Sequence, residues 1–445
     1  MASQSPYCVV AGLGKTGVSC VHHLLRQGME VAVTDSRAAP PGLAAIENLK
    51  SVRLRLGGLD PSLLEGASRL LLSPGISLRE PIAVQARERG IEVLGDIELF
   101  ARAVRAPVVA VTGTNGKSTV TTLVAHMAAA DGRRVLAGGN LGTPALDLLE
   151  EPLPELYVLE LSSFQLETTH RLDLLAGVVL NVTADHLDRY DSFDDYADAK
   201  ARLLRHAATA VLNVDDPGVA AMRRDGQPTL TFSLHAGHAD FNVIETPEGP
   251  ALARRGEALL ALSRLKIGGL HNAANALAAL ALGECAGLSR AGMLSALERF
   301  AGLAHRSQWV ARIGGVTYVN DSKGTNVGAT LAAVQGSAAS LVLIAGGDGK
   351  GQDFTPLATG LRGRVHDAVL IGRDAPALEA ALSGICTTHR AGSMSEAVHL
   401  ASRAANAGDT VLLSPACASL DMYRDYAQRG EAFVAAVHAM AQVHA

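Results

Sequence analysis

The stretch Val108-Val-Ala-Val-Thr-Gly-Thr-Asn-Gly-Lys-Ser-Thr-Val-Thr-Thr-Leu-Val-Ala-His-Met127 predicts a strand, a glycine-rich turn and a helix in direct succession. In such a turn the backbone N–H groups can surround phosphates, and the helix N-terminus adds the positive end of its dipole. Lys117 can reach the outer phosphates, and the Ser118 hydroxyl can ligate Mg²⁺. The stretch therefore predicts an α/β fold with a site for nucleotide phosphates.

The match to the full phosphate-loop pattern is incomplete, because the pattern requires glycine five positions before Gly116 and Val111 stands there. The alternative is a glycine-rich strand–helix turn with a lysine on the surface. The strand before the loop and the helix after it favour the phosphate site, since that context is what confirms the motif.

The same alternation of β-rich runs and Ala/Leu-rich helical stretches continues in both directions, as in parallel sheets covered by helices. We expect three α/β units with joints near 96–105 and 300–306, which gives domains at 1–96, 97–302 and 303–445. Within 225–266, short strands such as Thr229-Leu-Thr-Phe232 are expected to form a small antiparallel addition. The strands expected elsewhere are 7–12, 30–35, 69–75, 108–113, 156–161, 178–183, 210–215, 316–321, 341–346, 368–372 and 410–414.

A second glycine loop, Gly12-Leu-Gly-Lys-Thr-Gly17, follows the first strand and precedes a predicted helix at 18–27, and Asp35 ends the next strand. Taken alone, this arrangement is typical of a nicotinamide-dependent dehydrogenase, with the acid on the ribose. A tight structural turn is the simpler alternative. Two nucleotide loops in successive domains indicate two different nucleotides, one of them the carrier of a substrate.

The composition limits the partners. A formal net charge of −5 argues against a nucleic-acid or anionic-membrane surface. The five cysteines are scattered without a C-x-x-C pair, which fits a reducing cytoplasm. We expect neither a signal peptide nor a membrane-spanning segment. The sequence predicts a cytoplasmic monomer that acts on small molecules.

Several motifs together resemble the Mur ligase family over essentially the whole chain. The departures are Gly324, where many relatives have alanine, and Ser307-Gln-Trp309, where an aromatic–acidic continuation is commoner. The Asp-Asn-Pro-Arg sequence of the diamino-acid-adding member is absent. The matching motifs are Gly113-Thr-Asn-Gly-Lys-Ser-Thr119, Gly139-Asn-Leu-Gly142, Glu160-Leu-Ser-Ser-Phe-Gln-Leu166, Asn181-Val-Thr-Ala-Asp-His186, His271-Asn-Ala-Ala-Asn275, His305-Arg306, Asp321-Ser-Lys-Gly-Thr-Asn326, Gly346-Gly-Asp-Gly-Lys350 and Ser414-Pro-Ala-Cys-Ala-Ser-Leu-Asp421.

The resemblance implies an α/β enzyme of three domains with mostly parallel sheets: a Rossmann-like UDP-binding domain, a phosphate-loop ATPase domain and a Rossmann-like C-terminal domain. It implies ATP-dependent ligation of D-glutamate to UDP-N-acetylmuramoyl-L-alanine through an acyl phosphate, with release of ADP and phosphate, in peptidoglycan precursor synthesis. The alternatives are a sister amide ligase, meaning another Mur ligase, an L-glutamate-adding variant or a folylpolyglutamate synthase. A dehydrogenase and a nucleotide-binding module without activity belong to other classes.

By the same resemblance, two groups of residues bind the nucleotides. For ATP these are Gly113, Thr114, Asn115, Gly116, Lys117, Ser118, Thr119, Asn272, Asn275, Arg306 and Asp321. For the UDP substrate they are Gly14, Lys15, Thr16, Asp35, Ser36, Arg37, Gly75, Asn140 and His186. The plainer alternatives are helix capping for the two asparagines and a linker charge for Arg306.

The resemblance also assigns the catalytic residues Lys117, Glu160, His186 and Lys200. Ser118 and Glu160 would hold one Mg²⁺, and His186 and Lys200 would serve a second, with Mn²⁺ as a substitute metal. A lysine ammonium has no lone pair for a metal, so Lys200 is expected to carry a CO₂-derived carbamate. The alternatives are a solvated Lys200, a solvent-facing Glu160 and a loop-capping His186.

The acceptor, glutamate, has two carboxylates and needs cations and hydroxyls around it. Each lysine, taken separately, would be a surface group. The residues that the resemblance places in this pocket are Asp185, Lys323, Thr325, Lys350, Ser419, Leu420 and Tyr426.

Overall fold

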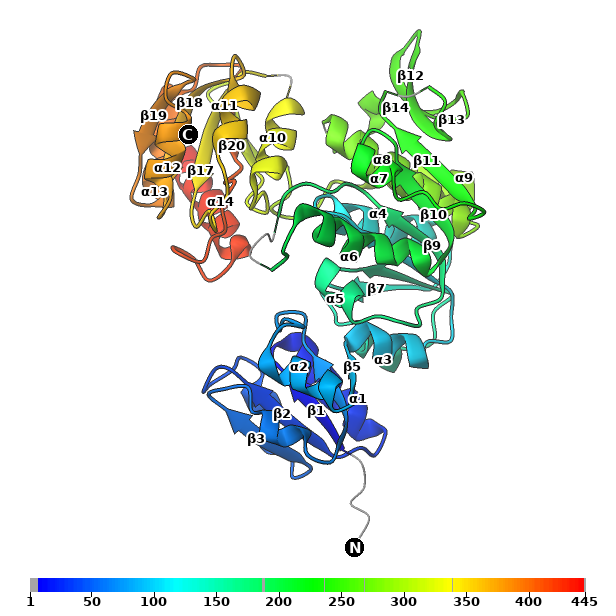
Figure 1. The fold of residues 1–445 in the computed structure, drawn as a ribbon. Coiled ribbons are helices and arrows are strands. Elements are labelled where there is room, and N and C mark those ends of the chain that lie inside the picture. Colours follow the sequence, from blue (N-terminus) through cyan, green and yellow to red (C-terminus); the bar gives the residue numbers. More distant parts are fainter. Residues whose placement is uncertain (1–6, 186–188, 236, 268, 338, 444–445) are drawn as a thin grey trace, which may run out of the picture. The chain divides into compact units, whose positions relative to one another are not determined.

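A computed structural model of the 445-residue chain describes residues 7–185, 189–235, 237–267, 269–337 and 339–443. The described residues form three sheets that are mostly parallel (Figure 1), and this confirms the three-domain α/β architecture. The chain packs into two compact units. One unit comprises Met1–Val243, Ala253–Glu257 and Leu277–Ala296, and the other comprises Ile244–Leu252, Ala258–Ala276 and Leu297–Ala445.

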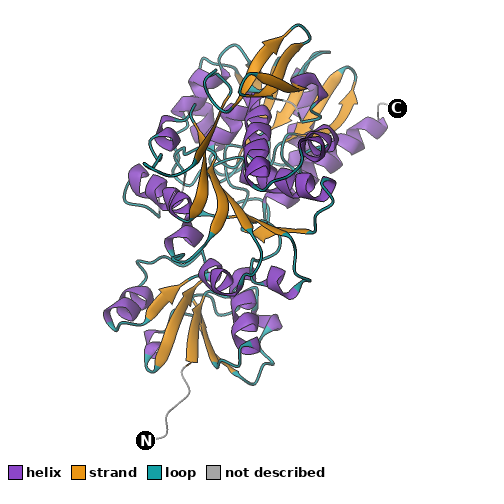
Figure 2. Ribbon diagram, turned by 90° about the vertical axis from the view of Figure 1, so that its right-hand side faces the viewer, coloured by secondary structure: helices purple, strands orange, loops and turns teal. Residues whose placement is uncertain are grey.

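The first sheet has five parallel strands in the order β3-β2-β1-β4-β5. Successive residues of β1 face opposite sides, so that Cys8 and Val10 pack into one apolar core and Val9 and Ala11 into another. Figure 2 shows these strands between helices, next to the N-terminus. The elements are β1 (Tyr7–Ala11), α1 (Lys15–Arg26), β2 (Val31–Asp35), β3 (Val52–Leu56), β4 (Ala67–Leu72), α2 (Pro81–Glu88), β5 (Glu92–Leu94) and α3 (Asp96–Ala103).

The strand order of this sheet reverses between β1 and β4. Ligands of open α/β sheets bind outside the carboxyl ends of the strands at such a switch point. The loops that begin at Gly12 and at Ser73 follow these two strands and therefore lie where a ligand is expected.

The central sheet has nine strands in the order β14-β13-β12-β11-β10-β9-β6-β8-β7. The strand of the phosphate loop, β6, is buried at every position and pairs in parallel with both β8 and β9. The elements up to residue 220 are β6 (Val108–Thr112), α4 (Lys117–Ala130), β7 (Val135–Gly139), β8 (Leu156–Glu160), α5 (Ser163–Glu167), β9 (Leu174–Val179), α6 (Phe193–Arg205), β10 (Ala207–Asn213) and α7 (Pro217–Ala220).

Two expectations about this sheet are wrong. The strand expected at 178–183 is β9, which begins at Leu174 and ends at Val179, so Asn181 lies in the loop beyond it. The antiparallel addition expected within 225–266 is wrong for its first strand, β11 (Thr229–Ser233), which pairs in parallel with β10 and with β12. The following elements are β12 (Phe241–Thr246), β13 (Gly249–Arg254), β14 (Glu257–Ala261), α8 (Leu270–Cys285) and α9 (Arg290–Arg299).

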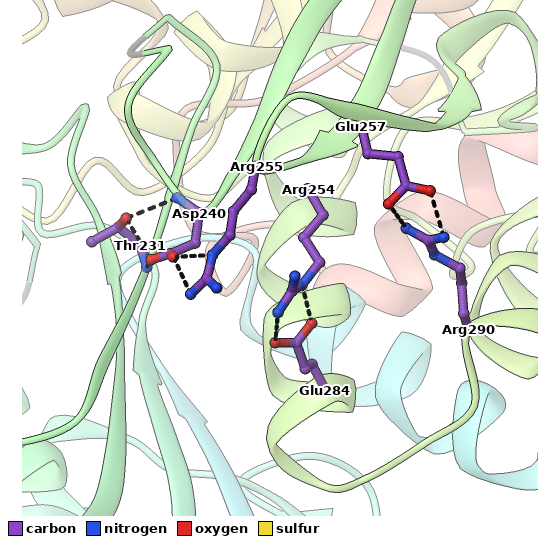
Figure 3. Close-up of polar contacts among 7 residues, drawn as sticks. All are labelled: Thr231, Asp240, Arg254, Arg255, Glu257, Glu284 and Arg290. Carbon is purple, nitrogen blue, oxygen red and sulfur yellow. Dashed lines mark hydrogen bonds and ion pairs between the residues drawn. The ribbon is translucent and has the colours of Figure 1, made fainter.

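Ion pairs join the turn between β13 and β14 to neighbouring elements (Figure 3). Arg254 forms a two-bonded pair with Glu284 of α8, and Arg290 forms another with Glu257. Arg255 lies beside Asp240, whose carboxylate also accepts the backbone N–H and the hydroxyl of Thr231. Such pairs fix the direction of the turn more than they stabilise it, because exposed ion pairs contribute little to stability.

The third sheet has the order β15-β16-β20-β17-β18-β19, with β15 antiparallel and the rest parallel. Leu341 and Leu343 of β17 pack against α10, α11 and α12, whereas Val342 and Ile344 pack against α13 and α14. The elements are β15 (Gln308–Ile313), β16 (Val316–Asn320), α10 (Val327–Gln335), β17 (Leu341–Gly346), α11 (Thr355–Leu361), β18 (Val365–Ile371), α12 (Ala375–Ala381), β19 (Thr387–Arg390), α13 (Met394–Ala404), β20 (Thr410–Leu413) and α14 (Tyr426–Val443).

Several helices begin at a residue whose side chain caps them. Ser162 and Gln165 form a reciprocal capping box at α5. Ser192, Asn326 and Ser393 cap α6, α10 and α13 through their side chains. Within the described ranges, none of the helices is both long enough and apolar enough to cross a bilayer.

Candidate active site

The phosphate loop runs from the end of β6 into α4. Gly116 has a left-handed backbone with φ of +84°, a conformation that glycine adopts without strain, and α4 begins at the next residue. The Lys117 ammonium donates to the carbonyl oxygens of Gly113 and Thr114, at 2.8 Å each. The loop therefore holds its lysine through its own backbone.

Asn181, which follows β9, holds the loop from the neighbouring strand. Its side-chain oxygen accepts the Asn115 N–H at 2.8 Å, and its amide group donates to the Asn115 carbonyl at 3.1 Å. Its own carbonyl accepts the Thr114 N–H at 2.9 Å. Asn181 begins the motif Asn181-Val-Thr-Ala-Asp-His186, but the sequence alone assigns it no role. An asparagine directly after a strand adjacent to the loop strand is the signal that would have identified it.

Glu160 ends β8 and is buried, with 3 % of its surface exposed. One carboxylate oxygen accepts the Ser118 hydroxyl at 2.6 Å, and the other accepts the Asn140 amide at 2.7 Å. A solvent-facing Glu160 is thereby excluded. A buried carboxylate is costly unless it is paired, so this position in the strand is explained by the polar groups gathered around it.

Lys200 lies in the interior, on α6, with 2 % of its surface exposed. Its Nζ donates to the Gly113 carbonyl at 2.9 Å and lies 4.4 Å from the ring centroid of Tyr196. Burial lowers the pKa of Lys200 well below its usual value, and the charge of Lys117 lowers it further. The alternative of a solvated surface lysine is excluded.

Tyr196 links this lysine to the loop. Its hydroxyl lies 3.1 Å from the Thr114 hydroxyl, which in turn accepts the Thr183 N–H. His186, predicted as a ligand for the second metal and for the UDP substrate, lies outside the described residues. Among the residues that are described, no group of three or more His, Cys, Asp and Glu side chains is arranged to hold a metal.

A cavity of about 510 Å³ opens at the switch point of the first sheet. It gathers every residue predicted for the UDP substrate except His186. Gly12, Ser73, Pro74 and Ile76 complete its wall and had not been predicted. The predicted residues that line it are Gly14, Lys15, Thr16, Asp35, Ser36, Arg37, Gly75 and Asn140.

The three glycines of the first loop differ in whether the protein leaves space for a side chain. A Cβ on Gly17 would lie 2.0 Å from the Gly12 carbonyl oxygen, and one on Gly12 would lie 2.9 Å from the Ser73 Cβ. A Cβ on Gly14 would meet no protein atom within 4 Å. Gly12 and Gly17 are therefore required by the fold, whereas Gly14 leaves space for a ligand to approach the backbone.

Asp35 is fully engaged by the protein itself. Its carboxylate accepts the Leu13 N–H at 2.6 Å and three donors of Arg37 at 2.8 Å each. Burial raises the pKa of Asp35, but these hydrogen bonds outweigh burial and lower it to about 2. A dehydrogenase would present this acid to a ribose, whereas here the carboxylate holds Arg37 at the cavity.

The remaining residues predicted for ATP lie in the second unit. Asn272 and Asn275 are buried in the first turns of α8 and hydrogen-bond to each other at 3.2 Å. Asp321 accepts the Ser414 hydroxyl at 2.8 Å and the Ser307 N–H at 3.1 Å. Burial raises the pKa of Asp321 to about 6, although the Ser414 bond and the charge of Arg306 oppose the rise.

The predicted glutamate residues of the second unit follow three neighbouring strands, β16, β20 and β17. Lys323 Nζ lies 4.0 Å from the ring centroid of Tyr426, Ser419 is buried, and Lys350 and Leu420 are exposed. Thr325 lies two residues beyond Lys323, whose carbonyl accepts its N–H. Asp185 belongs to the first unit, so its place in this pocket stays a prediction.

Gly324 departs from the commoner alanine for a local reason. A Cβ there would lie 2.7 Å from both the Asp321 carboxylate and the Ser414 hydroxyl. An alanine would therefore force one of these two hydrogen-bonded groups to move.

Three family models match consecutive parts of the chain. They are the MurD-like N-terminal domain of Mur ligases over residues 6–95, the Mur ligase middle domain over 111–283 and the Mur ligase glutamate ligase domain over 305–417. Together they span the first glycine loop, the phosphate loop and the loops after β16 and β17.

Two relatives are similar to the chain over nearly its full length. The UDP-N-acetylmuramoylalanine–D-glutamate ligase of Nitrosococcus oceani is 54% identical, with 96% of each chain covered. The ligase of the same name from Pseudomonas aeruginosa is 49% identical, with 97% of this chain and 98% of that one covered.

Among solved structures, the UDP-N-acetylmuramate–alanine ligase MurC of Thermotoga maritima aligns with a TM-score of 0.63 at 19% identity. The alignment covers 98% of this chain and 100% of that one. MurF ligase of the same organism, in complex with ADP, aligns with a TM-score of 0.61 at 17% identity. That alignment covers 100% of this chain and 97% of the other. These two likenesses show the fold, and the family models and the relatives about 50% identical show the lineage. The chain belongs to the Mur ligase family.

Proposed function

We propose that the protein is an ATP-dependent ligase that joins D-glutamate to UDP-N-acetylmuramoyl-L-alanine in peptidoglycan precursor synthesis. The proposed products are the amide, ADP and phosphate, and the proposed site of action is the cytoplasm. The observation that carries the proposal is the cluster of Lys117, Ser118, Glu160 and Lys200 at the phosphate loop, of which the last three are buried. Relatives about 50% identical over nearly the full chain, named as ligases of this substrate pair, support it.

In this proposal the substrate carboxylate attacks the γ-phosphate of ATP to form an acyl phosphate. Phosphoryl transfer requires positioning and neutralisation of charge more than covalent chemistry by the protein. The loop N–H groups and Lys117 provide both, because the Lys117 ammonium can exchange its two backbone acceptors for phosphate oxygens. The glutamate amine then attacks the acyl carbonyl, and phosphate leaves.

The donor set at Ser118 and Glu160 fits Mg²⁺, which prefers carboxylate and hydroxyl oxygens. Their oxygen atoms already converge at 2.6 Å. A bound Mg²⁺ would supply charge stabilisation at the transferred phosphoryl group. We assign the second metal to His186 and Lys200, with Mn²⁺ as a substitute in both sites.

We propose further that Lys200 is carbamylated. Carbamate formation requires the neutral amine, which attacks CO₂ and releases one proton. The lowered pKa of Lys200 favours that neutral amine. The carbamate would provide the anionic oxygens that an ammonium lacks.

The cavity of the first sheet suits the UDP handle, with Gly14 and Gly75 leaving the backbone accessible and Arg37 fixed by Asp35. The residues after β16, β17 and β20 suit glutamate, since lysines and hydroxyls match its two carboxylates. We retain 1–96, 97–302 and 303–445 as the domain boundaries, and the matched segments 6–95, 111–283 and 305–417 support them. The protein is proposed to act as a monomer.

The test is release of phosphate on mixing ATP, Mg²⁺, UDP-N-acetylmuramoyl-L-alanine and D-glutamate, with each component omitted in turn. L-glutamate, and a folate substrate in place of the UDP substrate, run in parallel to separate the sister ligases. We expect release only in the complete D-glutamate mixture. Equal release without the amino acid, or preference for L-glutamate or the folate, would contradict the proposal.

A further inference from the structure

Arg429 has one of the largest fully buried side chains of the protein, with 1 % of its surface exposed. It lies in the first turn of α14, in the second unit. Burial lowers the pKa of Arg429 to about 10, so the group remains a cation at neutral pH. A buried cation is costly, and an apolar side chain of similar volume is often tolerated as well or better in such a place. Its presence therefore requires an explanation.

The hydrogen bonds of this guanidinium explain the residue type. Nε donates to the Ser322 hydroxyl at 3.0 Å, and Nη2 donates to the Ser322 carbonyl at 2.8 Å. Nη1 donates to the carbonyls of Cys417 at 3.0 Å and Gly346 at 3.4 Å. Within the described residues, every acceptor recorded for this side chain is a neutral oxygen. Only a planar fork with five N–H donors can serve these directions at once.

The acceptors lie at the carboxyl ends of three strands. Ser322 follows β16, Gly346 is the last residue of β17, and Cys417 lies in the loop after β20. These strands are neighbours in the order β16-β20-β17, so their carboxyl ends lie at one edge of the sheet. Arg429 is therefore a single side chain that is bonded to the backbone where each of these strands passes into its loop.

Each of these loops carries part of the proposed glutamate pocket. Lys323 directly follows Ser322, Lys350 lies four residues after Gly346, and Ser419 lies two residues after Cys417. The backbone of α14 also bonds to the loop after β16, because the Tyr426 carbonyl accepts a hydrogen bond from the Ser322 hydroxyl at 2.8 Å. The ring of Tyr426 then lies under the Lys323 ammonium.

We infer that Arg429 is a positioning residue that sets the spacing of the acceptor pocket by bonding the backbone at the carboxyl ends of β16, β17 and β20, from which the pocket loops start. The inference rests on the proposed function, because it is that function which places glutamate among these loops. A displacement of about 1 Å at a reacting group can lower the rate by about 100-fold, so small shifts of Lys323 or Ser419 are sufficient for a large effect.

The experiment compares Arg429→Lys, Arg429→Met and the control Arg403→Met. Arg403 is an exposed residue in the last turn of α13. For each protein, kcat and the KM for D-glutamate, for ATP and for the UDP substrate are measured, together with the thermal midpoint. We expect the KM for D-glutamate to rise at least about tenfold in Arg429→Met, with those for ATP and the UDP substrate within about twofold of wild type. The KM of Arg429→Lys for D-glutamate should lie between those of wild type and Arg429→Met, because lysine keeps the charge but lacks the planar set of N–H donors.

Chemical rescue by an added guanidinium ion distinguishes the positioning role from a general loss of structure, which the ion would not reverse. Arg429→Ala leaves space for a free guanidinium ion, which should lower the KM for D-glutamate at concentrations that do not affect Arg403→Met. If the Arg429 variants do not fold, Ser322→Ala provides the test. It removes the hydroxyl that accepts from Nε and donates to Tyr426, and it should raise the same KM alone.

A uniform rise of all three KM values, or an unchanged KM for D-glutamate in folded variants, would overturn the inference. Failure of the proposed function looks different, because the wild-type enzyme itself would then release phosphate without D-glutamate. The two ideas can thus fail separately.

Discussion

Lys117 and Lys200 donate to a single acceptor, the carbonyl oxygen of Gly113, at 2.8 and 2.9 Å. Two ammonium groups on one neutral oxygen repel each other, and burial disfavours the charge on Lys200 as well. The environment of Lys200 therefore favours the neutral amine, which is the form that the proposed carbamate requires.

Replacement of Lys200 by alanine should lower kcat by more than about 100-fold, since loss of groups that only support a metal site already costs about 10- to 100-fold. Short carboxylates added to the assay should restore part of the rate by occupying the place of the carbamate. Lys50→Ala, at an exposed position, is the control. Turnover of Lys200→Ala at the wild-type rate would rule out the carbamate.

Glu160→Gln preserves the shape of the side chain and the contact with Asn140, but it removes the negative charge that faces Ser118. We expect kcat to fall by about 100- to 1,000-fold and the Mg²⁺ concentration for half-maximal rate to rise. The matched control is Glu151→Gln, at an exposed position. A Mg²⁺ titration that superimposes on the wild-type curve would show that Glu160 is not a ligand.

Gly14→Ala and Gly17→Ala should separate ligand binding from folding within one loop. Gly14→Ala places its Cβ in open space, so the free energy of unfolding should change by less than about 0.5 kcal/mol while the KM for the UDP substrate rises. Gly17→Ala forces a Cβ against the Gly12 carbonyl and should destabilise by about 1–3 kcal/mol or more. Urea unfolding and steady-state kinetics on both variants measure the contrast. If both lose stability equally, the ligand-facing role of Gly14 is wrong.

The buried carboxyl group of Asp96 should make the stability of the protein depend on pH. Burial raises the pKa of Asp96 to about 6, although the hydrogen bond from Gln165 lowers it. The folded state therefore binds a proton more tightly than the unfolded chain. This stabilising proton is present below about pH 4 and is lost as the pH rises to about 6, at a cost of roughly 2–3 kcal/mol. Asp96→Asn should therefore be more stable than wild type at pH 8 and lose that advantage near pH 4. Urea titrations at the two pH values provide the measurement, and a difference independent of pH would contradict it.

Much of the fold could be predicted because buried parallel strands are continuous apolar runs, as in β6 and β17, which end at Thr112 and Gly346 before their loops. The strands missed have weaker patterns. β3 alternates arginine with leucine, β19 is polar, and the edge strand β15 is half exposed. The parallel pairing of β11 could not be predicted, because a short strand of threonines fits either direction and tertiary pairing decides it.

Some residues of the candidate site could be predicted from the sequence, and others could not. The residues predicted for the UDP substrate, apart from His186, carry motifs that encode backbone shape, and they line a single cavity. Arg429 carries no motif and lies in a helix near the C-terminus, so its burial against three loops follows only from the folded arrangement. The same holds for Asn181, whose role depends on the neighbouring strand.

The hydrogen bonds that the Lys117 ammonium makes to Gly113 and Thr114 have a consequence for nucleotide release under the proposed function. If Lys117 binds phosphate as proposed, each bond that it gives up to a phosphate oxygen can re-form when the nucleotide departs. The net gain is then the difference between two sets of hydrogen bonds and is much smaller than either set. Such an exchange would favour rapid turnover over tight retention of the spent nucleotide.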